Sequence, residues 1–354
     1  MTSAAFVQIN GREVGPGKPV YVIAELSANH NQDFEQAIRI IQAAKESGAD
    51  AVKLQTYTPD TITIHSDREY FRVNGGTPWD GRYLHDLYAE ACMPWDWQPK
   101  LKKIANQLGM DLFSSAFDST AVDFLEQMSV PAHKIASFEI VDIPLIQKMA
   151  CAGKPLIMST GMASLEEIDE AVQSARAAGA RQLALLKCTS AYPASPDEMN
   201  LRSIPELASR FGLPVGLSDH TLGIAVPVAA VALGASIIEK HLTLSRALKG
   251  PDSAFSLEPE EFKAMVDAVR TTERALGQIQ FGPSAHESKS SIFRRSIYVV
   301  QDVSCGDVFT AANVRSIRPG YGLHTRHLQE VIGMRAARDI TRGTPLSWDL
   351  VTKQ

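Results

Sequence analysis

The sequence predicts an α/β protein, a (β/α)8 TIM barrel over roughly residues 18–275 followed by a small β-rich domain. Three observations predict this fold. Eight short apolar runs follow one another, each trailed by polar residues, and segments with helical spacing lie between most of them. No G-x-G-x-x-G turn follows the first run, which argues against the alternative of an open, doubly wound sheet that binds a dinucleotide.

The eight runs predict the strands and therefore the mouth of the barrel. They cover residues 21–24, 51–54, 111–114, 132–135, 155–158, 183–187, 214–217 and 236–239. The carboxyl ends of parallel strands open on one face, so polar side chains there are expected to face a ligand rather than the core. Glu25, Asn29 and His30 follow the first run, and Lys53 and Gln55 end the second.

Helix signals separate the runs. Asp33 can cap a helix that Gly48 ends, and Ser164 with Glu167 forms a capping box at the start of a helix that reaches Gly179. A further helix is expected over residues 259–276. These signals place helices between strands, as a barrel of this class requires.

Two regions lie outside this alternation. Residues 57–97 form a long insertion rich in Trp, Tyr, Gly and Pro, either a lid or substrate wall or a structural flap. Beyond the barrel domain, residues 1–276, a polar linker is expected at 277–290 and a small domain at 291–354. Short strands are expected there at 296–300, 306–309 and 314–317.

The composition is that of a globular enzyme. The formal net charge is -5 and no basic block is present, so nucleic acid is not an expected partner. No signal peptide or membrane-length apolar run is found, and a cytoplasmic protein with no membrane partner is expected. The four cysteines show no C-x-x-C spacing, and Cys92, Cys151 and Cys305 are interpreted as packing residues.

Two histidines at matching positions are the candidate metal ligands. His220 ends the seventh run and His241 the eighth, and neighbouring barrel strands lie about 5 Å apart, so their imidazoles can meet. Two imidazoles with open positions suit a divalent metal that also binds oxygen ligands. Either histidine alone would more often be structural. Glu25 is a candidate general base, metal ligand or salt-bridged barrel carboxylate.

Lysines and hydroxyls indicate an anion site at the same mouth. The expected members are Lys53, Lys134, Ser137, Ser159, Thr160, Lys187, Ser190 and Ser218. Several such groups around one cavity suit a phosphate together with a carboxylate. A barrel lysine can instead form a Schiff base or bridge strands through ion pairs.

Nine motifs, taken in order, resemble the sialic acid synthase family. They are AELSANHNQ, AVKLQTYTPDT, FSSAFD, KIASFEI, STGMAS, LLKCTSAYPA, GLSDHTLG, EKHLTLSR and GPDSAFSLEP, and RPGYGL resembles the SAF (antifreeze-like) domain attached to these enzymes. Synthases for N-acetylneuraminate or legionaminate usually carry G-x-N-H and K-x-x-S-G-E. Ser27-Ala28 and Phe138 occupy those places here, which favours the branch that makes pseudaminic acid.

The resemblance implies the reaction and the roles of individual residues. Phosphoenolpyruvate would condense with 2,4-diacetamido-2,4,6-trideoxy-altrose in its open aldehyde form, with C–O cleavage, releasing phosphate and giving a nine-carbon 2-keto acid. Glu25, His220 and His241 would be catalytic, with Mn²⁺ or Mg²⁺ on the two histidines. Phosphoenolpyruvate would be bound by Lys53, Lys134, Ser137, Ser159, Ser190 and Ser218. The sugar-side residues would be Gln55, Glu139, Tyr192, Asp252 and Phe255, with Arg318 contributed by the partner subunit of a domain-swapped homodimer.

Three alternatives remain at this level. The same chemistry can serve N-acetylneuraminate or legionaminate synthesis. A Schiff-base aldolase would use Lys134 or Lys53 covalently. A non-catalytic carbohydrate or ice-binding protein is suggested only by the C-terminal domain. Ice binding needs a flat, repeated, Thr-rich face, whereas this domain carries scattered arginines without a repeat.

Overall fold

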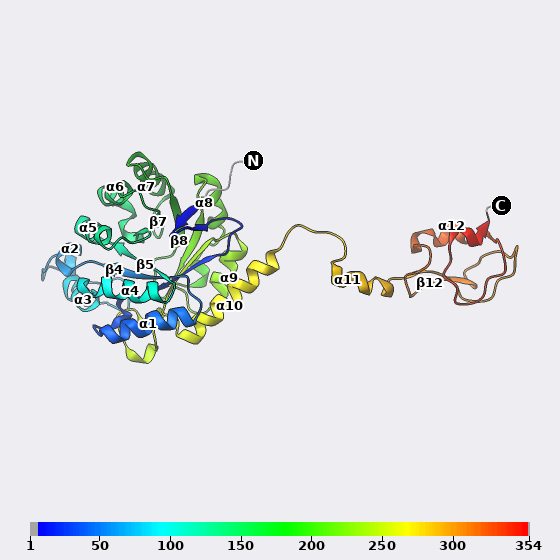
Figure 1. Cartoon of the computed structure of the whole chain (residues 1–354), viewed down its shortest axis with the longest axis horizontal. Coiled ribbons are helices and arrows are strands. Elements are labelled where there is room, and N and C mark those ends of the chain that lie inside the picture. The colour runs from blue at the N-terminus through cyan, green and yellow to red at the C-terminus, as the bar shows by residue number, and fades with distance from the viewer. Residues whose placement is uncertain (1–5, 353–354) are drawn as a thin grey trace. The chain divides into compact units, whose positions relative to one another are not determined.

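The structure is a computed structural model that describes residues 6–352. The chain divides into two compact units, Met1–Gly277 and Gln278–Gln354, which are described separately (Figure 1). Within residues 6–352, no helix is long and apolar enough to cross a membrane.

Unit 1 is a closed eight-stranded parallel barrel, which confirms the predicted fold class. The strand order is β10-β3-β4-β5-β6-β7-β8-β9. The strands are β3 Tyr21–Glu25, β4 Ala51–Thr56, β5 Asp111–Ala116, β6 His133–Ile135, β7 Leu156–Ser159, β8 Leu183–Cys188, β9 Val215–Asp219 and β10 Ile237–His241. Each of the eight apolar runs is a strand, because parallel strands covered on both faces are apolar throughout and become polar only at their ends.

Strand register brings the polar ends of three strands into one row. His241 of β10 pairs with Glu25 of β3, and Glu25 pairs with Lys53 of β4. Side chains in register on adjacent strands point to the same face of a sheet. All three are buried at the carboxyl end of the barrel.

Helices surround the barrel, as the predicted helix signals require (Figure 1). They are α1 Phe34–Glu46, α4 Gln98–Gln107, α5 Ser119–Gln127, α6 Ile143–Cys151, α7 Leu165–Ala177, α8 Ser203–Phe211, α9 Ala225–Ala232 and α10 Pro259–Leu276. The Asp33 carboxylate accepts from two backbone N–H groups of α1, and Ser164 with Glu167 forms the predicted capping box of α7. The bounds of α10 are those predicted.

An N-terminal hairpin, which the sequence did not predict, closes the other end of the barrel. It consists of β1 Val7–Ile9 and β2 Arg12–Val14. Its apolar side chains are fully buried, and Arg12 forms a salt bridge with Asp50, the residue before β4. Strands of three residues are too short to show a two-residue period.

The insertion at residues 57–97 contains α2 Pro59–Ile62 and α3 Leu84–Ala91 and is anchored by its tryptophans. The Trp95 ring packs against Phe124 of α5 with centroids 4.8 Å apart, and the Trp97 ring packs against Phe34 of α1 at 5.3 Å. These two tryptophans therefore stabilise the attachment of the insertion. Only Trp79 joins the aromatic residues at the barrel mouth, described below.

Unit 2 is a small β-rich domain with its own apolar core. Strand β11 Ser296–Val299 pairs with β12 Val314–Ile317, and β13 Arg335–Ala336 pairs with β14 Val351–Thr352. The other regular helices are α11 Ala285–Ser290 and α12 Leu328–Val331. The core includes Ile297, Val299, Phe309, Val314 and Leu346.

Three details of the sequence interpretation are corrected. The strand expected at 306–309 is absent, because Val308 forms only an isolated bridge with Arg335. The expected linker contains α11, whose Ser284 and Glu287 form a capping box. Two of the three cysteines interpreted as packing residues, Cys151 and Cys305, are exposed.

Candidate active site

A buried network of acids and bases occupies the carboxyl end of the barrel. The Nζ atom of Lys53 lies 2.5 Å from Oε2 of Glu25 and 3.6 Å from Oε1 of Glu239. Lys53 also donates to the hydroxyl of Ser115 at 3.2 Å. The amide of Gln55 donates to the other oxygen of Glu25 at 3.0 Å. One lysine thus holds two carboxylates in place, one of which is the predicted general base.

The surroundings of Glu25 and Glu239 shift the pKa values of these two carboxylates in opposite directions. Burial raises the pKa of Glu25 to about 7, and the opposing effect of Lys53 does not cancel it. Burial also disfavours the anion of Glu239, but Lys134 and Lys53 outweigh it and lower the pKa of Glu239. Burial opposes charge on Lys53, yet the two carboxylates raise its pKa overall. Glu239 and Lys53 therefore carry the stable charges, while Glu25 can exchange a proton near neutral pH.

A second lysine and several hydroxyls line the next part of the mouth. Lys134 is fully enclosed, and its Nζ donates to the hydroxyl of Ser159 at 2.6 Å. The hydroxyl of Ser218 donates to Glu239 at 3.1 Å, while the other carboxylate oxygen of Glu239 has no hydrogen-bond partner in the described chain. An unpartnered buried oxygen beside two lysines indicates a site built to contact something else.

Two serines converge on a glycine beside this lysine. A Cβ on Gly161 would lie 2.2 Å from Oγ of Ser190 and 2.6 Å from Oγ of Ser137, so a side chain there would displace both hydroxyls. The backbone N–H of Gly161 donates to Ser137 at 3.2 Å. Hydroxyls and ammonium groups brought this close suit the oxygens of a phosphate or carboxylate.

The two predicted metal ligands meet as expected. The ring centroids of His220 and His241 are 5.3 Å apart. Nδ1 of His220 lies 2.9 Å from the carbonyl of Thr189, which only accepts, so this nitrogen carries the proton. Nδ1 of His241 lies 3.1 Å from the hydroxyl of Ser27. In both rings Nε2 is the nitrogen left for another partner.

Protonation of the histidine pair is influenced by a buried thiol. Burial, followed by the charges of His220 and Lys53, holds the pKa of His241 well below its ordinary value. Burial acts in the same direction on His220, but Cys188 outweighs it and raises the pKa of His220. Burial opposes ionisation of Cys188, and His220 lowers the pKa of this thiol to about 7.

The donor set fits a divalent cation with open positions. Among the described residues, no three His, Cys, Asp or Glu side chains are grouped as a complete metal site. The two histidines would therefore supply two ligands, and the remaining positions would be free for oxygens of water or substrate. Imidazole nitrogen with oxygen ligands is a common donor set for divalent metals that act in catalysis.

Aromatic rings form a wall next to the histidines. The Tyr192 ring lies 4.4 Å from His220 and 5.1 Å from Phe255, and Phe255 lies 5.0 Å from His241. Trp79 of the insertion adds a ring 5.4 Å from Tyr192 and donates its indole N–H to the Pro251 carbonyl. This wall gives the mouth an apolar side opposite in character to the lysine pocket.

The remaining predicted sugar-side residues, Glu139, Asp252 and Arg318, come from three separate segments, and Phe138, the residue that favours the pseudaminate branch, directly precedes Glu139. Burial raises the pKa of Glu139 to about 7, and Oε2 of Glu139 has no hydrogen-bond partner within residues 6–352. Asp252 accepts from the backbone N–H of Ala28 at 3.2 Å. Phe138 is 54% exposed. Arg318 belongs to unit 2, where its exposed side chain directly follows β12.

Four residues proposed from strand ends do not join these contacts. Nζ of Lys187 bonds the Cys188 carbonyl of its own strand, and Thr160 bonds the Leu186 carbonyl. The side-chain amide of Asn29 donates a hydrogen bond to the Leu242 carbonyl, and the buried ring of His30 packs edge-on against Trp97. For Lys187 the reason is strand alternation, since neighbouring residues of β8 point to opposite faces and the next residue, Cys188, contacts His220.

Sequence reasoning missed three residues of the site. Glu239, Ser115 and Cys188 were not proposed, although all three contact proposed residues. The two-residue period of a strand gives a usable signal for Glu239, which lies two positions before His241 on the same face. No comparable signal identifies Cys188.

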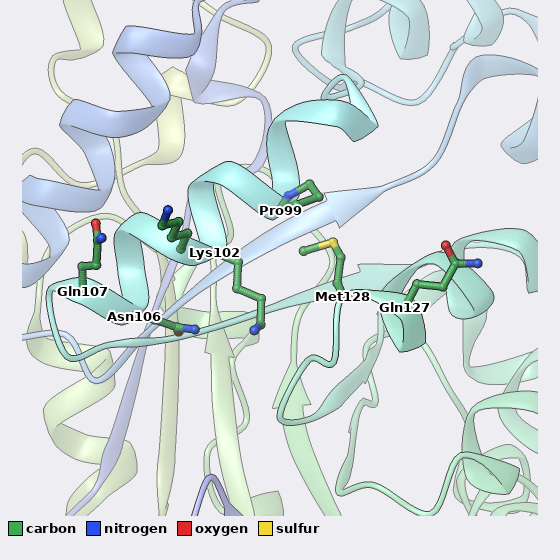
Figure 2. Close-up of a pocket in the computed structure, with 7 residues that line it drawn as sticks. Pro99, Lys102, Asn106, Gln107, Gln127 and Met128 are labelled. Carbon is green, nitrogen blue, oxygen red and sulfur yellow. The ribbon is translucent and has the colours of Figure 1, made fainter.

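A separate surface pocket lies on the helical layer of the barrel. Figure 2 shows it between α4 and α5. Its lining is Pro99, Lys102, Lys103, Asn106, Gln107, Gln127 and Met128. It contains no residue of the barrel mouth and no carboxylate, so it lacks the acid–base groups on which the candidate site depends.

Comparisons with known proteins agree with this geometry. The NeuB family model matches residues 40–281 and the SAF domain model matches residues 294–352. The chain is 45% identical to the pseudaminic acid synthase of Campylobacter jejuni, covering 93% of this chain and 96% of that protein. It is 38% identical to the N,N'-diacetyllegionaminic acid synthase of Legionella pneumophila, covering 97% and 98%.

A solved structure gives the same result at the level of the fold. The crystal structure of N-acetylneuraminic acid synthetase from Leptospira borgpetersenii, in complex with citrate, matches with a TM-score of 0.72 and 31% identity. The match covers 81% of this chain and 95% of that chain. The barrel, the SAF domain and the identity over nearly the whole length lead to one assignment: this chain belongs to the NeuB family, the family of the sialic acid synthases, and is a condensing enzyme of that family.

Proposed function

We propose that this chain is a pseudaminic acid synthase, which condenses phosphoenolpyruvate with 2,4-diacetamido-2,4,6-trideoxy-altrose to give pseudaminic acid and phosphate. One observation carries the proposal: a lysine and serine pocket and a histidine pair open on the same barrel mouth, with Glu25 between them in register. An anion, a sugar aldehyde and a proton-transfer group can then meet in one place.

The anion pocket suits phosphoenolpyruvate, whose phosphate and carboxylate both need compensating charge. Lys134 and Lys53 supply positive charge, and the hydroxyls of Ser137, Ser159 and Ser190 supply hydrogen bonds. Because these groups are buried, their interactions with an anion are screened less than they would be in water. The pocket would hold the enol with carbon 3 directed at the acceptor.

A divalent cation, Mn²⁺ or Mg²⁺, would be held by Nε2 of His220 and of His241. When bound, it would act as a Lewis acid toward the aldehyde of the acceptor. Nδ1 of His220 is fixed by the Thr189 carbonyl, which orients the ring and keeps the other nitrogen available. The choice between the two ions depends on their availability in the cell as well as on affinity.

Glu25 would transfer the protons of the reaction. Carbon 3 of the enol forms a bond to the aldehyde carbon, and cationic character develops at carbon 2. The aldehyde oxygen becomes a hydroxyl by taking the proton that Glu25 receives in the next step. Water adds at carbon 2 and loses a proton to Glu25, whose pKa of about 7 allows it to accept and return protons at neutral pH. The tetrahedral centre then collapses to the ketone, and phosphate leaves with the bridging oxygen.

The aromatic wall supports an acceptor that lacks a 6-hydroxyl. Trp79, Tyr192 and Phe255 offer apolar surface beside the histidines, where a methyl group packs better than a hydroxyl. The sequence features at Ser27-Ala28 and Phe138 favour the same branch. An acceptor related to N-acetylneuraminate synthesis would place a polar group against this wall.

Arg318 would complete the site from the partner subunit of a domain-swapped homodimer. Its exposed guanidinium, which follows β12, suits a carboxylate or sugar hydroxyls. The cytoplasm, where phosphoenolpyruvate is produced, is the proposed location of the reaction.

A phosphate-release assay tests the function. The protein would be supplied with phosphoenolpyruvate, Mn²⁺ and one of three acceptors: the altrose derivative, N-acetylmannosamine or the legionaminate acceptor. The highest kcat/KM is expected with the altrose derivative. Equal or better turnover with N-acetylmannosamine or with the legionaminate acceptor would show that the chain is a synthase of that other product. Absence of phosphate release with all three sugars would contradict the reaction class.

A further inference from the structure

Ser27 has an unusual backbone conformation for a buried serine. Its φ is 44°, in the left-handed region that favours glycine, and its side chain is buried at 2% exposure. Residues held in this conformation without being glycine cost free energy and persist where the surrounding structure determines them. Contacts of the buried side chain of Ser27 are therefore expected to offset this cost.

The hydroxyl of Ser27 is not used as a helix cap. Ser27 begins the short 3-10 helix η1, Ser27–His30, whose N-cap is Leu26 and which has no side-chain capping hydrogen bond. The hydroxyl instead lies 3.1 Å from Nδ1 of His241, which is 214 residues away in the chain. A local structural role of the hydroxyl is therefore not observed.

A carboxylate sets the direction of this hydrogen bond. Burial raises the pKa of Asp252, and the Ser27 hydroxyl and the backbone N–H of Ala28, which lies 3.2 Å from Oδ2, act against burial by stabilising the carboxylate. When Asp252 is ionised, its carboxylate only accepts, so the serine proton points to Asp252 and the serine oxygen accepts from Nδ1 of His241. Nδ1 of His241 then carries the ring proton, and Nε2 keeps its lone pair.

His220 is held in the same tautomer by a different group. Its Nδ1 donates to the Thr189 carbonyl, as described above. The two rings therefore have the same arrangement: Nδ1–H is held by a hydrogen bond, and Nε2 is left for another ligand. For His220 the backbone provides this, whereas for His241 a side chain in a strained conformation provides it.

We propose that Ser27 is a positioning residue that fixes the tautomer and orientation of His241 for binding a divalent cation. The inference rests on the proposed function, because it takes His220 and His241 as the cation ligands. It assigns to Ser27 a role that does not require contact with substrate.

The backbone strain gives a test that separates this role from a structural one. Ser27→Ala removes the hydroxyl and keeps a Cβ at positive φ, whereas Ser27→Gly removes the hydroxyl and the strain together. Ser129, exposed after α5 with a φ of 53°, provides the matched pair Ser129→Ala and Ser129→Gly. Mn²⁺ alone is titrated into each metal-free protein, and free Mn²⁺ is followed by electron paramagnetic resonance. Unfolding midpoints are measured in chelator.

Both Ser27 variants are expected to bind Mn²⁺ about 10- to 100-fold more weakly than the unmodified protein, the range for loss of a group that orients a ligand. Ser27→Gly should nevertheless unfold at the same temperature as Ser27→Ala or a higher one, because glycine accepts positive φ. Both Ser129 variants should bind Mn²⁺ normally. Nitrogen NMR of the imidazoles should show Nδ1–H at His241 in the unmodified protein and a mixed population in both Ser27 variants.

Two results would overturn the inference. One is unchanged Mn²⁺ affinity in both Ser27 variants. The other is an affinity loss that follows the unfolding midpoint, restored in Ser27→Gly as stability recovers, since that would make Ser27 structural. Failure of the proposed metal site gives a different result: His241→Ala would then bind Mn²⁺ as tightly as the unmodified protein.

Discussion

Glu25 and Lys53 are register partners on adjacent strands, and their charged groups lie 2.5 Å apart in the buried mouth of the barrel. Their side chains are 1% and 5% exposed. Burial raises the pKa of Glu25 to about 7, and Lys53, which is shared with Glu239, stabilises the Glu25 anion too little to cancel this effect. A carboxylate that titrates near neutral pH, fixed next to a histidine pair, is the basis of the predictions below.

Replacement of Glu25 by glutamine should slow turnover and preserve binding. Glutamine keeps the size of the side chain but cannot take a proton, so kcat should fall by about 10² to 10⁴. Binding of phosphoenolpyruvate should persist, because Lys134 and the hydroxyls remain. Steady-state kinetics together with calorimetric titration of phosphoenolpyruvate measure the two effects. Near-normal turnover would make Glu25 structural.

Activity should decrease in acid, with an apparent pKa near that of Glu25. The raised pKa means that Glu25 is protonated below about pH 7 and is then unable to accept a proton. The logarithm of kcat/KM should therefore fall with unit slope as the pH drops through this value. Glu139, whose pKa is also about 7, is the control. The acidic limb should persist in Glu139→Gln. If the decrease in acid disappeared in Glu139→Gln but remained in Glu25→Gln, Glu139 would be the base instead of Glu25.

Removal of the divalent cation should abolish turnover. Excess chelator should reduce activity to background, and Mn²⁺ should restore it. His220→Ala and His241→Ala should be inactive while keeping the circular dichroism spectrum of the barrel, because each removes one ligand and leaves the strands intact. Full activity in excess chelator would eliminate the metal assignment.

Arg318 can be tested by subunit complementation. Arg318→Ala and Glu25→Gln should each be poor enzymes as homodimers. If each site takes Glu25 from one chain and Arg318 from the other, every mixed dimer has one intact site, and statistical re-annealing should restore about a quarter of all sites. Absence of recovery, with mixed dimers demonstrated by mass spectrometry, would exclude the contribution of the partner subunit.

Most of the barrel could be predicted because the signals for its strands and helices lie within short stretches of the sequence. Parallel strands covered on both faces are apolar from end to end, and their helices carry caps such as Asp33 and Ser164. The β1–β2 hairpin and α11 were missed because each is too short to show a period. Aromatic composition alone did not separate Trp79, which faces the mouth, from Trp95, which packs against a helix.

The site was predicted in outline because strand ends share one face of a barrel. Glu25, Lys53, His220 and His241 were identified in this way, and the structure brings them together. The contact between Ser27 and His241 could not be predicted, because it joins residues 214 positions apart through a backbone conformation that the residue type does not favour. Burial, which sets the pKa of Glu25, likewise becomes known only from the folded chain.

The fate of the bridging oxygen of phosphoenolpyruvate tests the central claim most directly. Phosphoenolpyruvate carrying a heavy oxygen isotope between carbon 2 and phosphorus would be incubated with the protein, Mn²⁺ and the altrose derivative, and both products analysed by mass spectrometry. Addition of water at carbon 2 followed by C–O cleavage predicts a nine-carbon 2-keto acid without the label and inorganic phosphate carrying all of it. Label retained in the keto acid, or condensation without phosphate release, would contradict the proposed reaction.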